Sequence, residues 1–325
     1  MVFFLLNGLI GLKGLIVFKV GVIVATFALL WLAVRRTASH IPFLAAGIPA
    51  LLVFSSRTDV RPEMFSYLFL AYFLFAIFRA KYSNEARWSR SPEAIEDPRY
   101  RKAISGLYAL PIIQIFWTNM HIYFALGPLL LLLYLTDRLA HGSAPVPAKS
   151  QRVSLFTKTP FVIFVLTSLA TLFNPNFIRG ALAPLTILRN YGYSIVENQN
   201  IFFLTDYGIQ LRDIYLFEIS LIVLIISFVI ALRNGRKNIV FELLTVIIFT
   251  ILAGKMIRNL GVYTLVFLPI VASNLSTIKP ARFLSRTTIP TLIGFAVLFG
   301  WLIRSTINNN LYQWLGTPKK FGLGI

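Results

Sequence analysis

The sequence predicts an all-α fold, a polytopic transmembrane helical bundle with about ten membrane segments. Hydrophobic residues make up 57% of the chain and charged residues only 13%, a composition that the core of a soluble domain could not accommodate. The apolar residues form continuous runs, whereas the strands of a β-barrel alternate. Lys and Arg gather in the short connections between these runs, as they do in helical membrane proteins.

The expected segments follow one another along the chain, and several are shorter than a full membrane crossing. They are Leu15–Val34, Ile41–Ser55, Phe65–Phe78, Leu107–Trp117, Ile122–Leu135, Pro160–Phe173, Ile214–Leu232, Ile239–Leu252, Val262–Leu275 and Ile289–Ile303. We therefore expect residues 1–303 to form the bundle. Residues 304–325 would be an outer-side tail, the stub of a C-terminal domain.

The net charge and the cysteine and histidine content indicate which partners and cofactors to expect. A net charge of +19 invites a nucleic-acid partner, but the basic residues lie between apolar runs, where they fix orientation and meet anionic membrane lipids. We therefore expect no nucleic acid. With no cysteine there is neither a disulfide nor a thiolate, and the three histidines are scattered along the chain, so a metal site built by the protein is not expected.

Orientation follows from the basic residues. Arg35 and Arg36 close the first segment, which places that end in the cytoplasm. Alternation then puts the connection 79–102 in the cytoplasm and the long connection 174–213 outside. Read as one helix, residues 107–135 would be about 42 Å long, so two half-spans meeting at Asn119–His121 are expected instead.

A charged turn, Asp59-Val60-Arg61-Pro62-Glu63, separates two apolar runs that fall short of the roughly 20 residues a membrane crossing needs. Such a turn must thin the bilayer or lie below its surface, inside protein or a wet cavity. Pro62 can open the following helix. The alternative is an ordinary solvated hairpin in which Arg61 pairs with Glu63 or Asp59.

With this topology the outward connections share one end of the bundle and bring candidate functional groups together. The catalytic candidates are the carboxylates, suited to proton abstraction, and a histidine: Asp59, Glu63, Glu197 and His121. The binding candidates are cations for a lipid phosphate and amides for hydroxyl groups: Arg61, Lys255, Arg258, Asn119, Asn174 and Gln199.

Each of these groups also has a structural interpretation. The Asn119–His121 stretch can be a buried hinge between half-helices. Asn174 precedes a proline and can simply end a helix. Lys255 and Arg258 can reach the interface as amphipathic side chains. Two further carboxylates, Glu218 and Glu242, lie near segment ends and are expected to reach the interface.

At these same residues the chain resembles a known family, the bacterial multi-pass proteins of the glycosyltransferase-C (GT-C) superfamily. Its nearest described relatives there are the dolichyl-phosphate-mannose protein mannosyltransferases and the lipopolysaccharide sugar transferases. The matching pieces occur in the family's order over most of residues 8–275. They are GLIGLKGLIVFKV leading to LAVRR, VRPEMFSYLFLAYFLF, IFWTNMHIYFALGPLLLLLYL, ATLFNPNF, IVENQN and KMIRNLGVYTLVFLPIVA.

The resemblance implies a hexosyl- or pentosyltransferase of the bacterial inner membrane. Such an enzyme moves a sugar from a polyprenyl-phosphate donor on the outer side to a glycan, lipid or protein acceptor, with inversion at the sugar carbon. It leaves room for a divalent cation as cofactor. The family's acidic first outer loop precedes GLIGLKG, so this chain is expected to be a fragment without it. An active and an inactive fragment both stay open on that account.

Within the family's glutamate-tryptophan-glutamine pattern, Asn198 stands in place of the tryptophan, and Ile122 replaces the glycine that follows the histidine. Two other classes of function stay open. A transporter or flippase for lipid-linked sugars would show internal repeats, and no repeated half is visible. A non-catalytic membrane subunit is the other.

Overall fold

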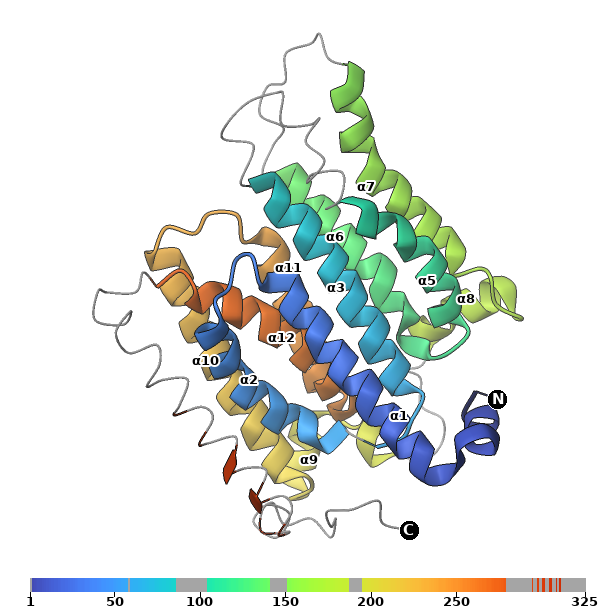
Figure 1. Ribbon diagram of the computed structural model, residues 1–325, viewed down its shortest axis with the longest axis vertical. Coiled ribbons are helices and arrows are strands. Elements are labelled where there is room, and N and C mark those ends of the chain that lie inside the picture. Colours follow the sequence, from blue (N-terminus) through green and yellow to red (C-terminus); the bar gives the residue numbers. More distant parts are fainter. Residues whose placement is uncertain are drawn as a thin grey trace.

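The computed structural model describes residues 2–57, 59–85, 104–140, 151–186 and 195–278, together with scattered positions between 294 and 310. All regular structure in these ranges is helical (Figure 1), which confirms the all-α prediction. The expected segment Ile289–Ile303, the tail 304–325 and most of the connection 79–102 lie largely or wholly outside the described residues.

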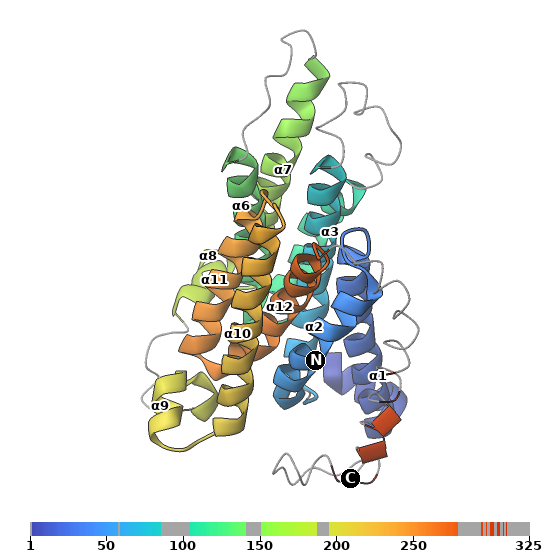
Figure 2. The same ribbon diagram turned by 90° about the vertical axis from the view of Figure 1, so that its left-hand side faces the viewer.

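The long helices run roughly side by side, and short helices lie at their ends (Figures 1 and 2). The α-helices are α1 (Val2–Val34), α2 (His40–Phe54), α3 (Glu63–Glu85), α5 (Leu110–Thr118), α6 (Leu126–Ala140), α7 (Gln151–Ala170), α8 (Phe177–Thr186), α9 (Ile201–Asp206), α10 (Leu211–Arg233), α11 (Val240–Lys255) and α12 (Leu260–Leu275). The 3₁₀ turns are η1 (Ser55–Arg57), η3 (Ser105–Ala109), η4 (Ile122–Ala125), η5 (Val196–Asn198) and η6 (Ile257–Asn259).

Five stretches of helix in the described chain are long and apolar enough to cross a membrane. They are Phe3–Val34, His40–Arg57, Glu63–Tyr82, Ile122–Ala140 and Leu211–Arg233. Length and composition thus support a helical membrane protein. They do not support the expected number of about ten segments, because α11 and α12 have only 16 residues each and α5 only 9.

The expected break between two half-spans is present. Helix α5 ends at Thr118, and His121 takes an extended conformation before η4 begins. Gln114 stabilises this break, because its amide donates to the Phe124 carbonyl at 2.9 Å and so satisfies a group that a continuous helix would have paired. The break turns the chain so that His121 lies beside α3.

Two helices form the centre of the bundle. Every residue of α12 from Leu260 to Asn274 is buried, and α12 contacts α1, α2, α3, α10 and α11. Helix α3 carries a buried apolar series between α1, α6 and α12. Because other helices enclose α3 and α12, contacts with those helices, and not with lipid, determine where the ends of α3 and α12 lie.

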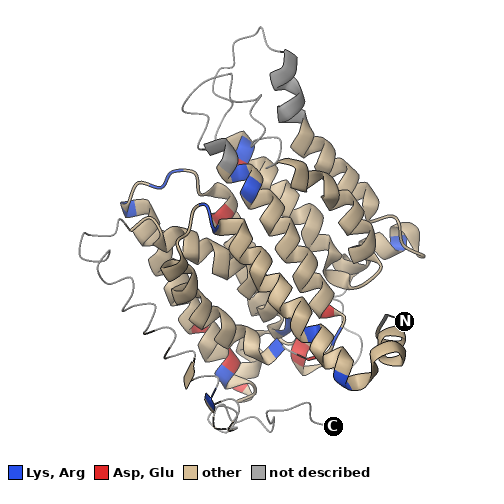
Figure 3. Ribbon diagram, viewed as in Figure 1, with Lys and Arg blue, Asp and Glu red and all other residues tan. Residues whose placement is uncertain are grey.

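Most charged side chains of the described helices lie toward the two ends of the bundle, and apolar helix lies between (Figure 3). One cluster lies at the end of α3 that is opposite to Glu63, and we call it the opposite-end network. In it Lys81 of α3 contacts Asp137 of α6 at 3.0 Å and Glu242 of α11 at 2.7 Å. Arg236 adds a second contact to Glu242 at 3.2 Å. Glu242 is 0% exposed, so the expectation that it reaches the interface is wrong: α3 and α6 supply its partner and its cover.

The close approach of α12 to α3 gives a first testable prediction. A Cβ atom at Gly261 would lie 2.5 Å from the hydroxyl of buried Tyr67, so Gly261→Ala must displace that ring. We expect the free energy of unfolding to fall by about 1–3 kcal/mol, measured by denaturant titration in mixed micelles. The control is Gly254→Ala, whose Cβ would have Ile201 as its nearest neighbour at 3.9 Å, and equal stability of the two variants would contradict this packing.

Candidate functional site

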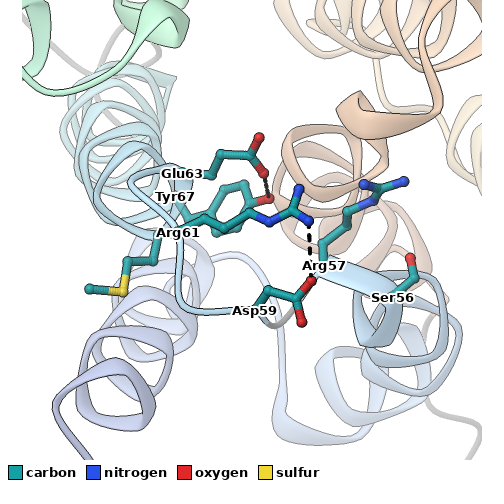
Figure 4. A pocket seen from close by; sticks show the side chains of 7 residues that line it. Ser56, Arg57, Asp59, Arg61, Glu63 and Tyr67 are labelled. Carbon is teal, nitrogen blue, oxygen red and sulfur yellow. Dashed lines mark hydrogen bonds and ion pairs between the residues drawn. The ribbon is translucent and has the colours of Figure 1, made fainter. Parts of the chain in front are cut away.

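The candidate site begins in the connection between α2 and α3. Helix α3 starts at Glu63, directly after Pro62, so the proline opens the helix as the sequence predicts. Here the Arg61 guanidinium points toward Asp59, and Glu63 points toward the Tyr67 hydroxyl (Figure 4). They line a small pocket whose residues are Ser56, Arg57, Asp59, Arg61, Glu63, Met64 and Tyr67.

Arg61 pairs mainly with a residue far away in the chain. Its Nη1 donates to both carboxylate oxygens of Glu197, at 2.9 and 2.7 Å. Asp59 lies 3.6 Å from Nη2 of the same guanidinium. The alternative expected from the sequence, in which Arg61 pairs only within its own turn, therefore accounts for the longer contact with Asp59. The shorter contact with Glu197 joins the α2–α3 connection to η5.

Glu63 forms the second half of the cluster. Its Oε1 accepts from Arg258 of η6 at 3.0 Å, and its Oε2 accepts from the Tyr67 hydroxyl at 3.3 Å. His121 Nε2 lies 3.9 Å from Oε1. Arg258 also donates to Asn198 of η5 at 3.2 Å, so one arginine joins both glutamate-centred groups into what we call the ion-pair cluster.

The cluster thus brings together residues that the sequence placed at one mouth of the bundle. Asp59, Arg61, Glu63, His121, Glu197 and Arg258 all belong to it. Arg61 and Asp59 keep 43% and 48% of their side chains exposed, whereas Glu63 keeps 9%. The cluster is therefore most open to a ligand on the Arg61 side, and Glu63 is exposed only slightly, in the small pocket that it helps to line.

Four predicted binding residues stand apart from these ion pairs. Asn119 donates to the Ile115 and Phe173 carbonyls, and Asn174 caps the turn before α8 through Thr171, Phe177 and Asn176. Both amides thus bind the backbone. Asn174 ends the helix as its structural interpretation expects, whereas Asn119 is exposed and not part of a buried hinge. Gln199 is half-buried and meets η6 through its carbonyl, which accepts from the Ile257 N–H, and Lys255 is exposed at the end of α11.

Several members of the site were not predicted from the sequence. Arg57, only 8% exposed, lies 3.7 Å from Glu197, and the available signal was its position directly after an apolar run. Tyr67 follows Glu63 by four residues, the spacing that puts two side chains on one helix face. Tyr123 donates to Asn259 at 2.9 Å, a contact for which the local sequence holds no signal.

Electrostatics differ across the site. Partial burial alone would raise the pKa of Glu197, but the hydrogen bond from Arg61 and the charges of Arg57, Arg61 and Arg258 outweigh it, so this pKa is lowered. The hydrogen bond to Glu197 in turn raises the pKa of Arg61. Burial, and secondarily the charge of Arg258, lowers the pKa of His121 to about 4. His121 is consequently neutral at pH 7.

The described residues around the ion-pair cluster do not form a group of metal ligands. Across the described residues, no group of three or more His, Cys, Asp or Glu side chains could hold a metal ion. Glu63 and Glu197 instead take arginines as partners. The divalent cation that the resemblance allows stays a prediction.

The lowered pKa of His121 predicts a pH dependence of stability. Its ordinary value is 6.5 and its value in the fold about 4, so between these pH values the unfolded chain binds the proton and the folded chain does not. We expect the contribution of His121 to the free energy of unfolding to be complete above pH 6.5. It should fall by about 3 kcal/mol as the pH drops to 4. Glu197 acts at the acid end, since the stability from its lowered pKa is lost only below its ordinary 4.5.

The measurement is a series of unfolding titrations in detergent between pH 7 and pH 4. His121→Gln should flatten the decline between pH 6.5 and 4.5, because the group that titrates there is gone. His40→Gln removes an exposed histidine at the start of α2 and should keep the wild-type decline. If both variants decline as steeply as the wild type, His121 is not the group responsible.

The fold and the site together define a class, a helical membrane protein with a partly open ion-pair cluster at one end of its apolar bundle. Comparison of the chain with protein-family models, curated proteins and solved structures gave no match. Membership of the GT-C superfamily accordingly rests on the sequence motifs alone and continues as a proposal.

Proposed function

We propose that the chain is a membrane glycosyltransferase of the GT-C type that uses a polyprenyl-phosphate-linked sugar on the outer side of the bacterial inner membrane. The observation that carries this proposal is the ion-pair cluster. Segments up to 195 residues apart converge on it, as in the contact between Arg258 and Glu63. Its open side presents Arg61 at the end of an apolar bundle, where a lipid phosphate can reach it while the tail stays in hydrocarbon.

Arginine is suited to this task because its planar fork binds phosphate oxygens in pairs. Arg61 already binds both carboxylate oxygens of Glu197, in this case through Nη1 alone. Arg57 lies close enough to keep hold of Glu197 when Arg61 turns to a ligand. The Nε atoms of Arg57 and Arg258 are buried without a hydrogen-bond acceptor, whereas the Arg61 side chain is 43% exposed, so Arg61 is the arginine that an anionic ligand meets first.

The two glutamates fit different roles. The pKa of Glu197 is lowered by its arginine partners, which makes it a weak base and suits it to orienting Arg61. Glu63 is the proposed base: it takes the proton of an acceptor hydroxyl as that oxygen forms its bond to the sugar carbon. The bond from the sugar carbon to the phosphate oxygen breaks, and polyprenyl phosphate leaves toward Arg61 and Arg258.

The full GT-C architecture, with about ten membrane segments, belongs to this proposal. So do the glycan, lipid or protein acceptor and a divalent cation. Lys255, Gln199, Asn119 and Asn174 would in that case contact the outer parts of donor or acceptor. Asp59, half-exposed beside Arg61, would steer the same guanidinium.

The experiment that tests the function uses the chain reconstituted in liposomes with a radiolabelled polyprenyl-phosphate hexose. Glycosyl transfer predicts labelled product and free polyprenyl phosphate. A flippase would move the donor across the bilayer and leave the sugar–phosphate bond intact, and a non-catalytic subunit would do neither. Either of these last two results would overturn the proposal.

A further inference from the structure

A hydrogen-bond chain runs from the core to the candidate site through three side chains. Trp117 of α5 donates from Nε1 to Ser66 Oγ of α3 at 2.9 Å. Ser66 Oγ lies 3.2 Å from His121 Nδ1. Trp117 and Ser66 are both 0% exposed, so neither can touch a ligand, and His121 is the only member of this chain with access to the cluster.

The direction of this chain follows from chemistry. The indole N–H of Trp117 can only donate, so Ser66 Oγ accepts from it and is free to give its own hydrogen to His121 Nδ1. The backbone N–H of Tyr123 also points at Nδ1, at 3.4 Å. A nitrogen that faces an N–H donor on one side and a hydroxyl on the other is an acceptor. The proton of neutral His121 therefore resides on Nε2.

Nε2 faces Glu63. The 3.9 Å between Nε2 and Oε1 is too long for a direct hydrogen bond. A hydroxyl oxygen that lies to one side of this pair, about 2.8 Å from each atom, can accept from Nε2–H and donate to Oε1. A donor and an acceptor at this separation match one hydroxyl group, whereas a phosphate oxygen has no hydrogen for Oε1.

We propose that Ser66 and Trp117 are positioning residues that fix His121 as a neutral donor through Nε2, and that His121 and Glu63 together hold one hydroxyl group of the acceptor. The second half of this inference rests on the proposed glycosyl transfer, and the first half does not. His121 then orients the hydroxyl oxygen and Glu63 takes its proton. His121, a catalytic candidate from the sequence, acts here as a hydrogen-bond donor, and Glu63 is the base.

The first experiment is nitrogen NMR of the full chain labelled at its three histidines, with His121→Gln to assign the signal. At pH 7 the wild type should show a bare Nδ1 and a protonated Nε2. Ser66→Ala and Trp117→Phe should each give a mixture of the two tautomers, and Ser66→Thr, which keeps the hydroxyl, should restore the wild-type spectrum. A proton on Nδ1 of the wild type, or an imidazolium at pH 7, would overturn the assignment.

The positioning role has its own failing result. If Ser66→Ala and Trp117→Phe both fold and keep the wild-type tautomer, the backbone N–H alone fixes the ring and the two side chains have only a structural role. Variants that do not fold leave the wild-type spectrum to decide the tautomer, because that measurement needs no substitution at either position.

The second experiment measures transfer kinetics. His121→Gln keeps an N–H donor and should stay within tenfold of wild-type kcat/KM for the acceptor. His121→Phe keeps a ring but no donor, and should lose about 10- to 100-fold, mostly as a raised acceptor KM with the donor KM unchanged. Equal kinetics in both variants would refute the hydroxyl role. A wild-type chain without transfer would count against that role and the function, while the NMR result on the tautomer would stand.

Discussion

Replacing Lys81 with methionine is expected to lower the free energy of unfolding by about 3–5 kcal/mol. Lys81 is 3% exposed and is the shared partner of two buried carboxylates, Asp137 at 3.0 Å and Glu242 at 2.7 Å. Methionine fills the same volume but removes the positive charge. Asp137 and Glu242 would then both lose the cation that they share in the buried network, which is the costly part of the change.

The measurement is unfolding in mixed micelles, with two comparisons built in. Lys255→Met makes the same chemical change at the exposed opposite end of α11 and should alter stability by no more than about 0.5 kcal/mol. Adding Asp137→Asn to Lys81→Met should recover part of the loss, because it removes one of the two carboxylates that shared the lysine. A loss below about 1 kcal/mol for Lys81→Met would mean that water or lipid headgroups already screen the network.

Arg61→Ala is expected to reduce glycosyl transfer by about 10²–10³-fold while leaving expression and stability near wild type. The guanidinium is 43% exposed and pairs with Glu197, so its removal costs little folding energy, about 1 kcal/mol or less. The loss in rate has a different origin. Without Arg61 the charge that develops on the departing phosphate has no paired donor on the open side of the site.

Matched variants separate this effect from a general loss of charge. Arg61→Lys keeps the charge but not the two-pronged contact and should recover only part of the rate. Glu197→Ala should also abolish transfer, since it frees the guanidinium from its orienting partner. Arg179→Ala, at an exposed arginine of α8, should have no effect. Unchanged transfer in both Arg61→Ala and Glu197→Ala would refute the site.

Local signals account for the parts of the site that could be predicted. Charges between short apolar runs marked the connection with Asp59, Arg61 and Glu63, and the excess length of 107–135 marked the break that turns His121 inward. Partners could not be predicted in the same way. Glu197 lies 136 residues from Arg61, and no periodicity links two residues across that distance.

The asparagines show what residue type alone does not decide. Asn119 and Asn174 are ligand candidates by type, and in the fold their amide N–H groups donate to backbone carbonyls near helix ends. Whether a polar side chain meets a ligand or the backbone depends on which helix terminus lies within about 3 Å of it. That is a property of the assembled chain.

By itself the sequence determined the helical, membrane-type class and the end of the bundle where charge would gather, because composition and run length act locally through the cost of placing polar groups in lipid. The tertiary structure decided how many helices are long enough to span. It also decided that Glu242 is buried beside Lys81, and that Arg61 meets Glu197 while Glu63 meets Arg258. Packing of α3 and α12 against their neighbours makes these choices, since a buried charge is stable only where another helix supplies its partner.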